Sequence, residues 1–246
     1  MTAERERGKV RTMTVPAEPN PLKLAAAEAA ARLVEDGTIV GLGSGSTASL
    51  AVRALGRRVS EGLRILGVPT SEKTAELARE VGIPLSTLAE HSQIALTIDG
   101  ADEVELGTLD LIKGLGGALL REKLVAVATA RLAIVVDENK LVERLASERR
   151  PLPVEVVAFA WQTTARRLEA LGAECTLRLV EGGQPFVTDQ GNYTLDCRFA
   201  VAPPAGELQK RLDGTVGVVE HGLFLGMTSQ VIVGGTAGVR VLQKGQ

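Results

Sequence analysis

Glu122 falls in a helical pattern whose same face is small or apolar, at Ala118, Val125 and Ala126. A carboxylate held against such a face loses hydration, so its pKa rises toward the range that a general base needs near neutral pH. The alternative is that the Arg-Glu-Lys triplet at residues 121–123 is an ordinary solvated group of charges. The residue type and its setting therefore make Glu122 a candidate base.

Further carboxylates follow an apolar run in the segment LTIDGADEVE. Residues 94–98 have the composition of a buried strand, and Asp99 and Asp102 come just after it. Open α/β sheets bind ligands at the carboxyl ends of their strands. Acids at this edge can take part in such chemistry, although Asp99 and Asp102 could equally cap a loop. We expect Glu103 and Glu105 to be solvated.

The segment GLGSGST, residues 41–47, has the composition of an anion-binding turn. Glycines let a backbone approach a phosphate, a following helix favours negative charge, and Ser44, Ser46 and Thr47 add hydroxyl donors. A dinucleotide fingerprint would place a third glycine at position 46, and a P-loop would continue into Gly-Lys-Ser/Thr. The segment therefore indicates a small phosphate ester rather than a nucleotide. The alternative is a tight turn with Ser46 or Thr47 as a helix cap.

A second glycine turn occurs in LIKGLGGALLREK, where Lys113 precedes Gly114, Gly116 and Gly117. Two such turns at one sheet edge suggest a ligand with more than one anionic or hydroxyl group. Lys140, in the segment DENK, follows another apolar run, where a solvated surface lysine is the alternative.

The elements that position these residues alternate between strands and helices. The apolar runs TIVGLG, LRILGVPTS, QIALTIDG and RLAIVVD are separated by helical patterns. This alternation predicts an α/β fold with a Rossmann-like parallel sheet and helices on both faces. After Arg150 the order becomes β-α-β-β-α-β, which is typical of a ferredoxin-like unit.

We therefore predict three parts of the chain. Residues 1–20 form a disordered tail, because this segment is polar and broken by prolines. Residues 21–150 and 219–246 form the Rossmann-like domain, and residues 151–218 form an inserted smaller α+β domain.

Composition narrows the classes of function. The formal charge of −2 and the 2% content of aromatic residues disfavour a nucleic-acid partner or an anionic membrane surface. Cys175, Cys197, His91 and His221 do not form the close cluster that a zinc site needs. Because there is no apolar signal core and no bilayer-spanning run, we expect a cytoplasmic protein.

Four segments, in their order and spacing, resemble the ribose-5-phosphate isomerase type A family. They are GLGSGST, TIDGADEVE, KGLGGALLREK and PLPVEVV, and the resemblance covers about residues 20 to 243. It implies interconversion of D-ribose 5-phosphate and D-ribulose 5-phosphate through an enediolate, in the non-oxidative pentose phosphate pathway. It also implies a sugar phosphate as the partner, no metal or organic cofactor, and a homodimer or homotetramer.

The resemblance also implies roles for particular residues. Glu122 corresponds to the catalytic carboxylate, with Lys113 stabilising charge on the carbonyl oxygen and Asp99 and Asp102 binding hydroxyls and carrying protons. The implied substrate-binding residues are Ser44, Gly45, Ser46, Thr47, Asp99, Gly100, Ala101, Asp102, Lys113, Gly114, Leu115, Gly116, Lys140 and Lys23. Ser44 stands where threonine is frequent, and Leu115 and Leu120 replace smaller or polar residues, so Leu115 could crowd the pocket.

Two other classes of function stay open. A sugar-phosphate sensor would keep the phosphate loop but need a DNA-binding segment, which the first twenty residues do not provide. An amino-sugar phosphate deaminase would use a histidine, yet His91 and His221 lie outside the motif segments. A CoA transferase would form a thioester on a glutamate.

Overall fold

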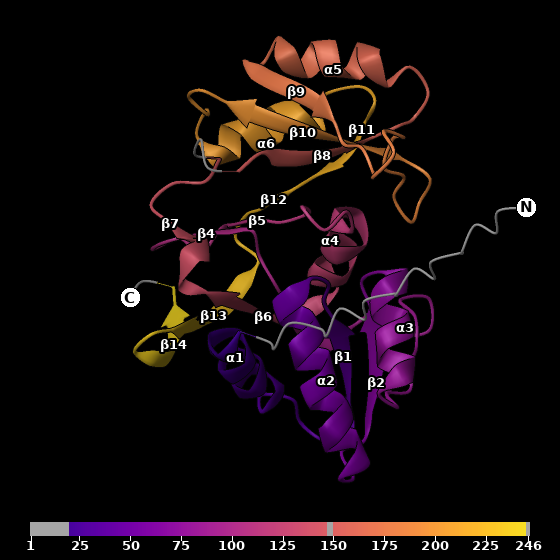
Figure 1. Ribbon diagram of the computed structural model, residues 1–246, viewed down its shortest axis with the longest axis vertical. Helices are drawn as coiled ribbons and strands as arrows, with labels where there is room; N and C mark the ends of the chain where they lie inside the picture. The colour runs from indigo at the N-terminus through magenta and orange to yellow at the C-terminus, as the bar shows by residue number, and fades with distance from the viewer. Residues whose placement is uncertain (1–19, 147–149, 245–246) are drawn as a thin grey trace, which may run out of the picture.

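The computed structural model describes residues 20–146 and 150–244. Apart from Asn20, the expected tail over residues 1–20 lies outside the described residues. Figure 1 shows a larger α/β unit that contains the N-terminal helices, and a smaller unit that carries α5 (Trp161–Glu169) and α6 (Ala205–Asp213).

Six strands form the larger sheet: β1 (Thr38–Leu42), β2 (Ile65–Pro69), β3 (Ile94–Asp99), β6 (Thr129–Asp137), β13 (Thr228–Gly235) and β14 (Gly238–Gln243). Their order is β14-β13-β6-β3-β1-β2. Five are parallel, and β14 pairs antiparallel with β13. The predicted Rossmann-like parallel sheet is confirmed.

The side chains of β6 alternate between two cores. Ala133 and Val135 pack in the core beneath the helices α1 (Pro21–Ala31) and α2 (Ser46–Ser60). Ile134 packs on the opposite face, with Ala126 of α4 (Leu119–Val127). Because successive strand residues point to opposite faces, both faces of the sheet are covered by apolar packing. Helix α3 (Glu72–Glu80) follows β2 and contacts α2.

The smaller unit has a four-stranded antiparallel sheet in the order β11-β8-β10-β9. Its strands are β8 (Leu152–Val156), β9 (Ala173–Leu177), β10 (Tyr193–Phe199) and β11 (Val218–His221). Together with α5 and α6 this is the predicted ferredoxin-like arrangement. The expected boundary after residue 218 falls inside β11, which pairs with β8, and the full division of the chain into domains stays a prediction.

A third, small sheet lies between the two units (Figure 1). It joins β12 (Leu223–Phe224), β5 (Leu111–Ile112), β4 (Glu103–Glu105) and β7 (Leu141–Val142), and η1 (Glu138–Lys140) precedes β7. Its pairing overturns two sequence expectations. Glu103 is fully buried in β4 and accepts a hydrogen bond from the Ala146 N–H. Glu105 is half-buried and accepts from the Leu145 N–H and the Thr108 hydroxyl.

Among the described helices, none combines the length and the apolar character needed to cross a bilayer.

Candidate active site

The glycine loop and the Asp99 turn meet at a switch point of the larger sheet. Strand β1 leads to β2 on one side, whereas β3 pairs with β1 on the other. Connections diverge at such a point and leave a crevice for ligands. The Ser44 N–H donates to Asp99 Oδ1 over 3.0 Å, which joins the two connections. A side chain at Gly43 would place its Cβ 2.2 Å from Asp99 Oδ1, so this contact requires glycine.

The N-terminus of α2 is open toward the crevice. Its N-cap is Gly45, with φ +96° and no side chain to cap the helix. The expectation that Ser46 or Thr47 caps the helix is wrong, since both are its first residues. Uncapped N–H groups at a helix start favour an anion. The Lys23 ammonium adds positive charge here, 3.2 Å from Ser46 Oγ and 3.5 Å from Asp137 Oδ2.

The Ser44 hydroxyl belongs to a cluster of hydroxyl groups. Its Oγ lies 2.8 Å from Thr70 Oγ1 and from Ser71 Oγ, and 3.1 Å from Thr74 Oγ1. Thr70 and Ser71 lie between β2 and α3, Thr74 lies in the first turn of α3, and all three are buried. These contacts fix the glycine loop, so Ser44 has a structural task that its position in the motif did not reveal.

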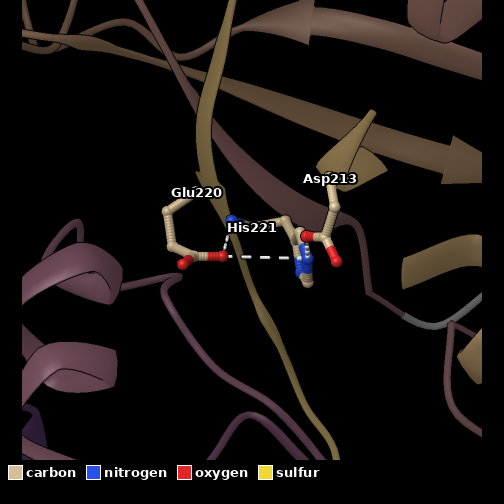
Figure 2. Close-up of side chains that lie close together, drawn as sticks. All are labelled: Asp213, Glu220 and His221. Atoms are coloured by element: carbon tan, nitrogen blue, oxygen red, sulfur yellow. Dashed lines mark hydrogen bonds and ion pairs between the residues drawn. The ribbon is translucent and has the colours of Figure 1, made fainter. Parts of the chain in front are cut away.

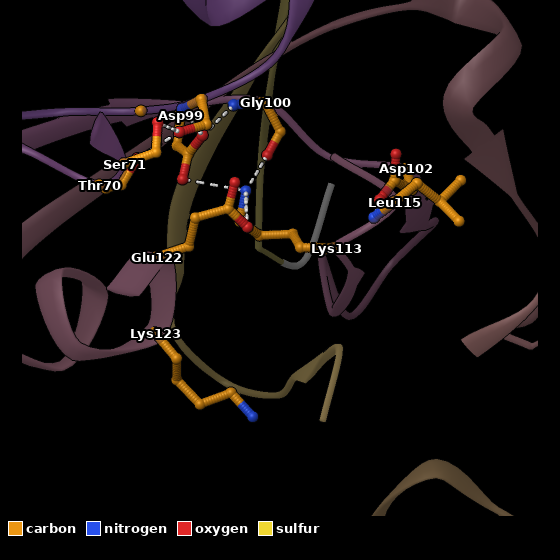
Figure 3. A network of polar contacts seen from close by, with 12 residues as sticks. Thr70, Ser71, Asp99, Gly100, Asp102, Lys113, Leu115, Glu122 and Lys123 are labelled. Carbon is orange, nitrogen blue, oxygen red and sulfur yellow. Dashed lines mark hydrogen bonds and ion pairs between the residues drawn. The ribbon is translucent and has the colours of Figure 1, made fainter. Parts of the chain in front are cut away.

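The centre of the site is the Lys113 ammonium (Figure 3). It lies 2.9 Å from Asp99 Oδ2 and 3.4 Å from Glu122 Oε2, and it donates to the Gly100 carbonyl at 2.5 Å. All three charged side chains are buried. Burial opposes the charge on Lys113, but the Asp99 and Glu122 carboxylates outweigh burial and raise the pKa of the ammonium. The site therefore holds a permanent cation between two acids.

Glu122 is buried at 5% exposure, which confirms the expected loss of hydration and excludes a solvated charge triplet. Burial raises its pKa, the negative charges of Asp99 and Asp102 add to this effect, and Lys113 opposes it; the resulting pKa is about 8. Burial also raises the pKa of Asp99. Two carboxylates that face one ammonium oppose each other's ionisation, because each negative charge disfavours the other.

Asp102 orders the second glycine turn. Its Oδ2 accepts the Leu115 N–H at 2.9 Å, and its own carbonyl accepts from the Arg150 guanidinium. Gly114 has φ +103°, a conformation that side chains disfavour. The two aspartates therefore each hold one of the two glycine loops.

One cavity gathers most of the predicted residues. Its lining consists of Ser44, Gly45, Ser46, Thr47, Gly100, Ala101, Asp102, Lys113, Gly114, Gly116, Glu122, Val135, Val136 and Lys140.

Three of the implied substrate-binding residues are absent from that described lining, namely Asp99, Leu115 and Lys23, and so is Leu120. Asp99 is covered by the residues that line the cavity, and its oxygens accept hydrogen bonds from main-chain N–H groups and from Lys113. The Leu115 N–H donates to Asp102, and the Leu115 side chain is not part of that lining. Lys23 stands beside Ser46 at the edge.

Sequence reasoning missed several residues of the site. Asp137 ends β6 as Asp99 ends β3, and this shared position at a strand end was a usable signal. Val135 and Val136 line the cavity from the same strand. Arg150 lies in the connection to the small unit, and its guanidinium donates to the Asp102 carbonyl. Burial and the positive charge of Arg150 lower the pKa of Lys140. The sequence around Arg150 carries no signal for this role.

Among the described residues, one group has the donor types of a metal site: Asp213, Glu220 and His221 (Figure 2). The Leu223 N–H donates to His221 Nδ1 at 3.2 Å, so the ring proton is on Nε2, which donates to Asp213 at 3.0 Å. Glu220 Oε1 is bound by the Lys123 ammonium at 2.6 Å. These groups satisfy one another, and we assign them no metal.

Comparison with known proteins identifies the family. The family model for ribose 5-phosphate isomerase A (phosphoriboisomerase A) matches residues 66–238. The ribose-5-phosphate isomerase A of Gloeobacter violaceus is 60% identical over 221 residues, which cover 90% of this chain and 95% of that protein.

Two solved structures have the same fold. The ribose 5-phosphate isomerase A of Methanocaldococcus jannaschii is 42% identical with a TM-score of 0.86, covering 91% of this chain and 99% of that one. A D-ribose-5-phosphate isomerase in complex with phospho-erythronic acid is 36% identical, also with a TM-score of 0.86, and covers 91% of this chain and 98% of that one. The chain therefore belongs to the ribose 5-phosphate isomerase A family.

Proposed function

We propose that this protein interconverts D-ribose 5-phosphate and D-ribulose 5-phosphate, in the non-oxidative pentose phosphate pathway. One observation carries the proposal: a buried carboxylate, Glu122, lies 3.4 Å from the Lys113 ammonium in a cavity that also contains the open N-terminus of α2. A base, a cation and an anion site are the groups that isomerisation of a phosphorylated aldose needs. The solved relative with phospho-erythronic acid, a four-carbon phosphorylated acid, supports this ligand class.

The chemistry assigns separate tasks to Glu122 and Lys113. Glu122 takes the proton from C2 of the open-chain aldose, and the C–H electron pair forms the C1–C2 double bond of a cis-enediolate. The carbonyl π electrons move to O1, where the Lys113 ammonium stabilises the negative charge. After a proton passes from O2 to O1, Glu122 returns its proton to C1 and the ketose forms. A carboxylate with a pKa of about 8 is well matched to both transfers near neutral pH.

The phosphate belongs at the other end of the cavity. The first N–H groups of α2, the Ser46 and Thr47 hydroxyls and the ammonium groups of Lys23 and Lys140 provide donors and positive charge there. Asp102 lines the cavity and can accept a sugar hydroxyl. A direct contact of Asp99 with the sugar stays a prediction. Its bonds to Ser44, Gly100 and Lys113 support a positioning task.

The test is proton exchange from ribose 5-phosphate in D₂O, followed by NMR, with and without EDTA. The wild type should exchange the C2 proton in both buffers. Glu122→Gln should lower the exchange rate by about a hundredfold or more while phospho-erythronic acid still binds. Glu61→Gln, at an exposed position, is the matched control. Near-normal exchange in Glu122→Gln would remove Glu122 as the base, and binding without exchange in the wild type would indicate a sensor.

We also propose that the chain forms a homodimer or homotetramer in the cytoplasm. Large apolar side chains remain exposed on the single chain, including Phe159 at 88% and Val127 at 64% exposure, and such side chains are often covered by another subunit. Light scattering measures the assembly directly, and a monomer mass at micromolar concentration would contradict it.

A further inference from the structure

Arg178 reaches from the small unit to the backbone of the second glycine turn. Its Nη1 donates to the Gly114 carbonyl at 3.0 Å and to the Leu115 carbonyl at 3.1 Å. Its Nε donates to Asp196 Oδ2 at 3.0 Å, and its Nη2 pairs with the other oxygen of Asp196. One guanidinium therefore joins a strand of the small sheet to two successive peptide groups of the cavity wall.

The peptide geometry links these contacts to the cavity. The described chain contains no cis peptide bond, so the C=O and N–H of each peptide group point in opposite directions. With the Gly114 carbonyl on Arg178, the Leu115 N–H points away from Arg178 and reaches Asp102, which lines the cavity. The Leu115 carbonyl also accepts a hydrogen bond from Arg178, so the Gly116 N–H, like the Leu115 N–H, points away from Arg178.

The Gly116 N–H is free for a ligand. Within the part of the chain that the structure describes, no acceptor is bonded to this N–H, and Gly116 lines the cavity. A cation on the carbonyl side of a peptide group strengthens the group as an N–H donor, because hydrogen bonds that share a peptide polarise one another.

Phe186, whose N–H donates to the Arg178 carbonyl at 2.9 Å, packs its ring against the same turn. The Phe186 ring lies so close to Gly117 that a Cβ there would be 2.3 Å from its Cζ. The Arg178 guanidinium lies 5.9 Å from the centre of that ring. The side chain of Arg178 is 13% exposed, so its bonds are shielded from water. The second glycine turn is thus held by the packing of the Phe186 ring and by two charge-assisted hydrogen bonds from Arg178, both in the small unit.

We propose that Arg178 is a positioning residue of the isomerase site, which orients the Leu115–Gly116 peptide so that its N–H donates to the sugar part of the bound substrate. The proposal rests on the proposed function and adds a residue from the small unit to it. Asp196 orients the guanidinium. A planar fork is suited to this geometry because it can bond two carbonyls and one carboxylate together, which an ammonium cannot do in the same orientation.

The experiment compares Arg178→Met, Arg178→Lys and Asp196→Asn with the wild type. Arg167→Met, at an exposed position on α5, is the matched control. Arg178→Met should lower kcat/KM about 10- to 100-fold and weaken inhibition by phospho-erythronic acid by a similar factor. Inhibition by inorganic phosphate should change less than about threefold, because α2 binds that end of the ligand. Arg178→Lys and Asp196→Asn should fall between Arg178→Met and the wild type.

Hydrogen exchange measured by mass spectrometry tests the positioning without any turnover. The amides of residues 114–117 should exchange at least about tenfold faster in Arg178→Met, while α2 should exchange as in the wild type. Unchanged exchange in this turn, or equal losses of affinity for phosphate and phospho-erythronic acid, would overturn the proposal. If the wild type itself does not isomerise ribose 5-phosphate, the proposed function fails, and the exchange comparison still decides the role of Arg178.

Discussion

Asp99 and Lys113 form an ion pair of 2.9 Å in which neither side chain is more than 3% exposed. A buried pair loses the hydration of both charges and persists only where further hydrogen bonds satisfy it. Here the Ser44 and Gly100 N–H groups donate to Asp99, and Lys113 donates to the Gly100 carbonyl. With these bonds the pair stays charged, and Glu122 is the carboxylate left to gain or lose a proton.

The first prediction concerns the pH dependence of catalysis. The activity kcat/KM should rise with pH as Glu122 ionises, with an acid limb near its pKa of about 8. The negative charge of Asp99 raises that pKa, so Asp99→Asn should move the acid limb to lower pH, whatever the height of the plateau. Initial rates measured from pH 5 to 9.5 provide the profile.

Asp36→Asn is the control for this profile. Asp36 is exposed and paired with Arg64, so its loss should leave the acid limb where it is in the wild type. An acid limb that moves to higher pH in Asp99→Asn would mean that hydrogen bonds to Asp99 outweigh its charge.

The second prediction concerns stability. The pKa of Glu122 is about 8 in the folded chain against a reference value of 4.5. Between these values the unfolded chain has released a proton that the folded chain keeps, so the free energy of unfolding falls as pH rises. Glu122→Gln lacks this proton. Its free energy of unfolding should therefore increase relative to the wild type from about pH 5 to pH 8, by at most about 1.4 kcal/mol per pH unit.

Urea denaturation at pH 5, 6.5 and 8 measures this difference. In the surface variant Glu61→Gln, the free energy of unfolding should change with pH as it does in the wild type. A constant offset between Glu122→Gln and the wild type would show that Glu122 is already ionised at pH 5.

The larger sheet was predictable because its evidence is local. The runs that became β1, β3 and β6 are short and apolar, and helical patterns separate them. Parallel strands end at one edge, so the glycine loop and the Asp99 turn could be placed together before their contact was known. The small and apolar residues on the helix face of Glu122 likewise predicted its burial.

Long-range pairing explains what the sequence did not show. Glu103 is an acidic residue that follows a strand end, yet β4 pairs with β5 and β7, and its burial depends on residues far along the chain. The Ser44 hydroxyl bonds to Thr70 and Ser71, which are likewise distant in the sequence. Arg178 follows β9 in the small unit, which carries no catalytic motif, so its contact with Gly114 follows only from the packing of one unit on the other.

The third prediction concerns Gly43. Replacement by alanine puts a Cβ within 2.2 Å of Asp99 Oδ1, so the carboxylate or the loop must move. We expect a loss of about 1 to 3 kcal/mol in the free energy of unfolding, together with a lower kcat, because Asp99 also holds Lys113. Chemical denaturation and initial rates measure the two effects.

Gly206→Ala is the matched control for this substitution. Gly206 lies in α6 with no atom near its added Cβ, so alanine should be neutral or stabilise the chain by up to about 1 kcal/mol. Wild-type activity and stability in Gly43→Ala would contradict the packing seen here.

The last prediction concerns Lys123, the neighbour of Glu122 on α4. Its ammonium donates to Glu220 Oε1 at 2.6 Å and to the His221 carbonyl at 2.7 Å, and it lies 4.9 Å from the centre of the Phe224 ring. These contacts tie the helix that carries Glu122 to β11 and β12. Lys123→Met leaves the Glu220 carboxylate without its cation, so the free energy of unfolding should fall by about 3 kcal/mol.

Activity separates two consequences of this loss. Because Lys123 faces the small unit and is absent from the described lining of the cavity, Lys123→Met should keep measurable activity at low temperature and lose it on heating before the wild type does. Arg131→Met removes an exposed pair with Glu35 and should change the free energy of unfolding by less than about 1 kcal/mol. A loss in Lys123→Met no larger than in Arg131→Met would show that the contact does not hold α4 in place.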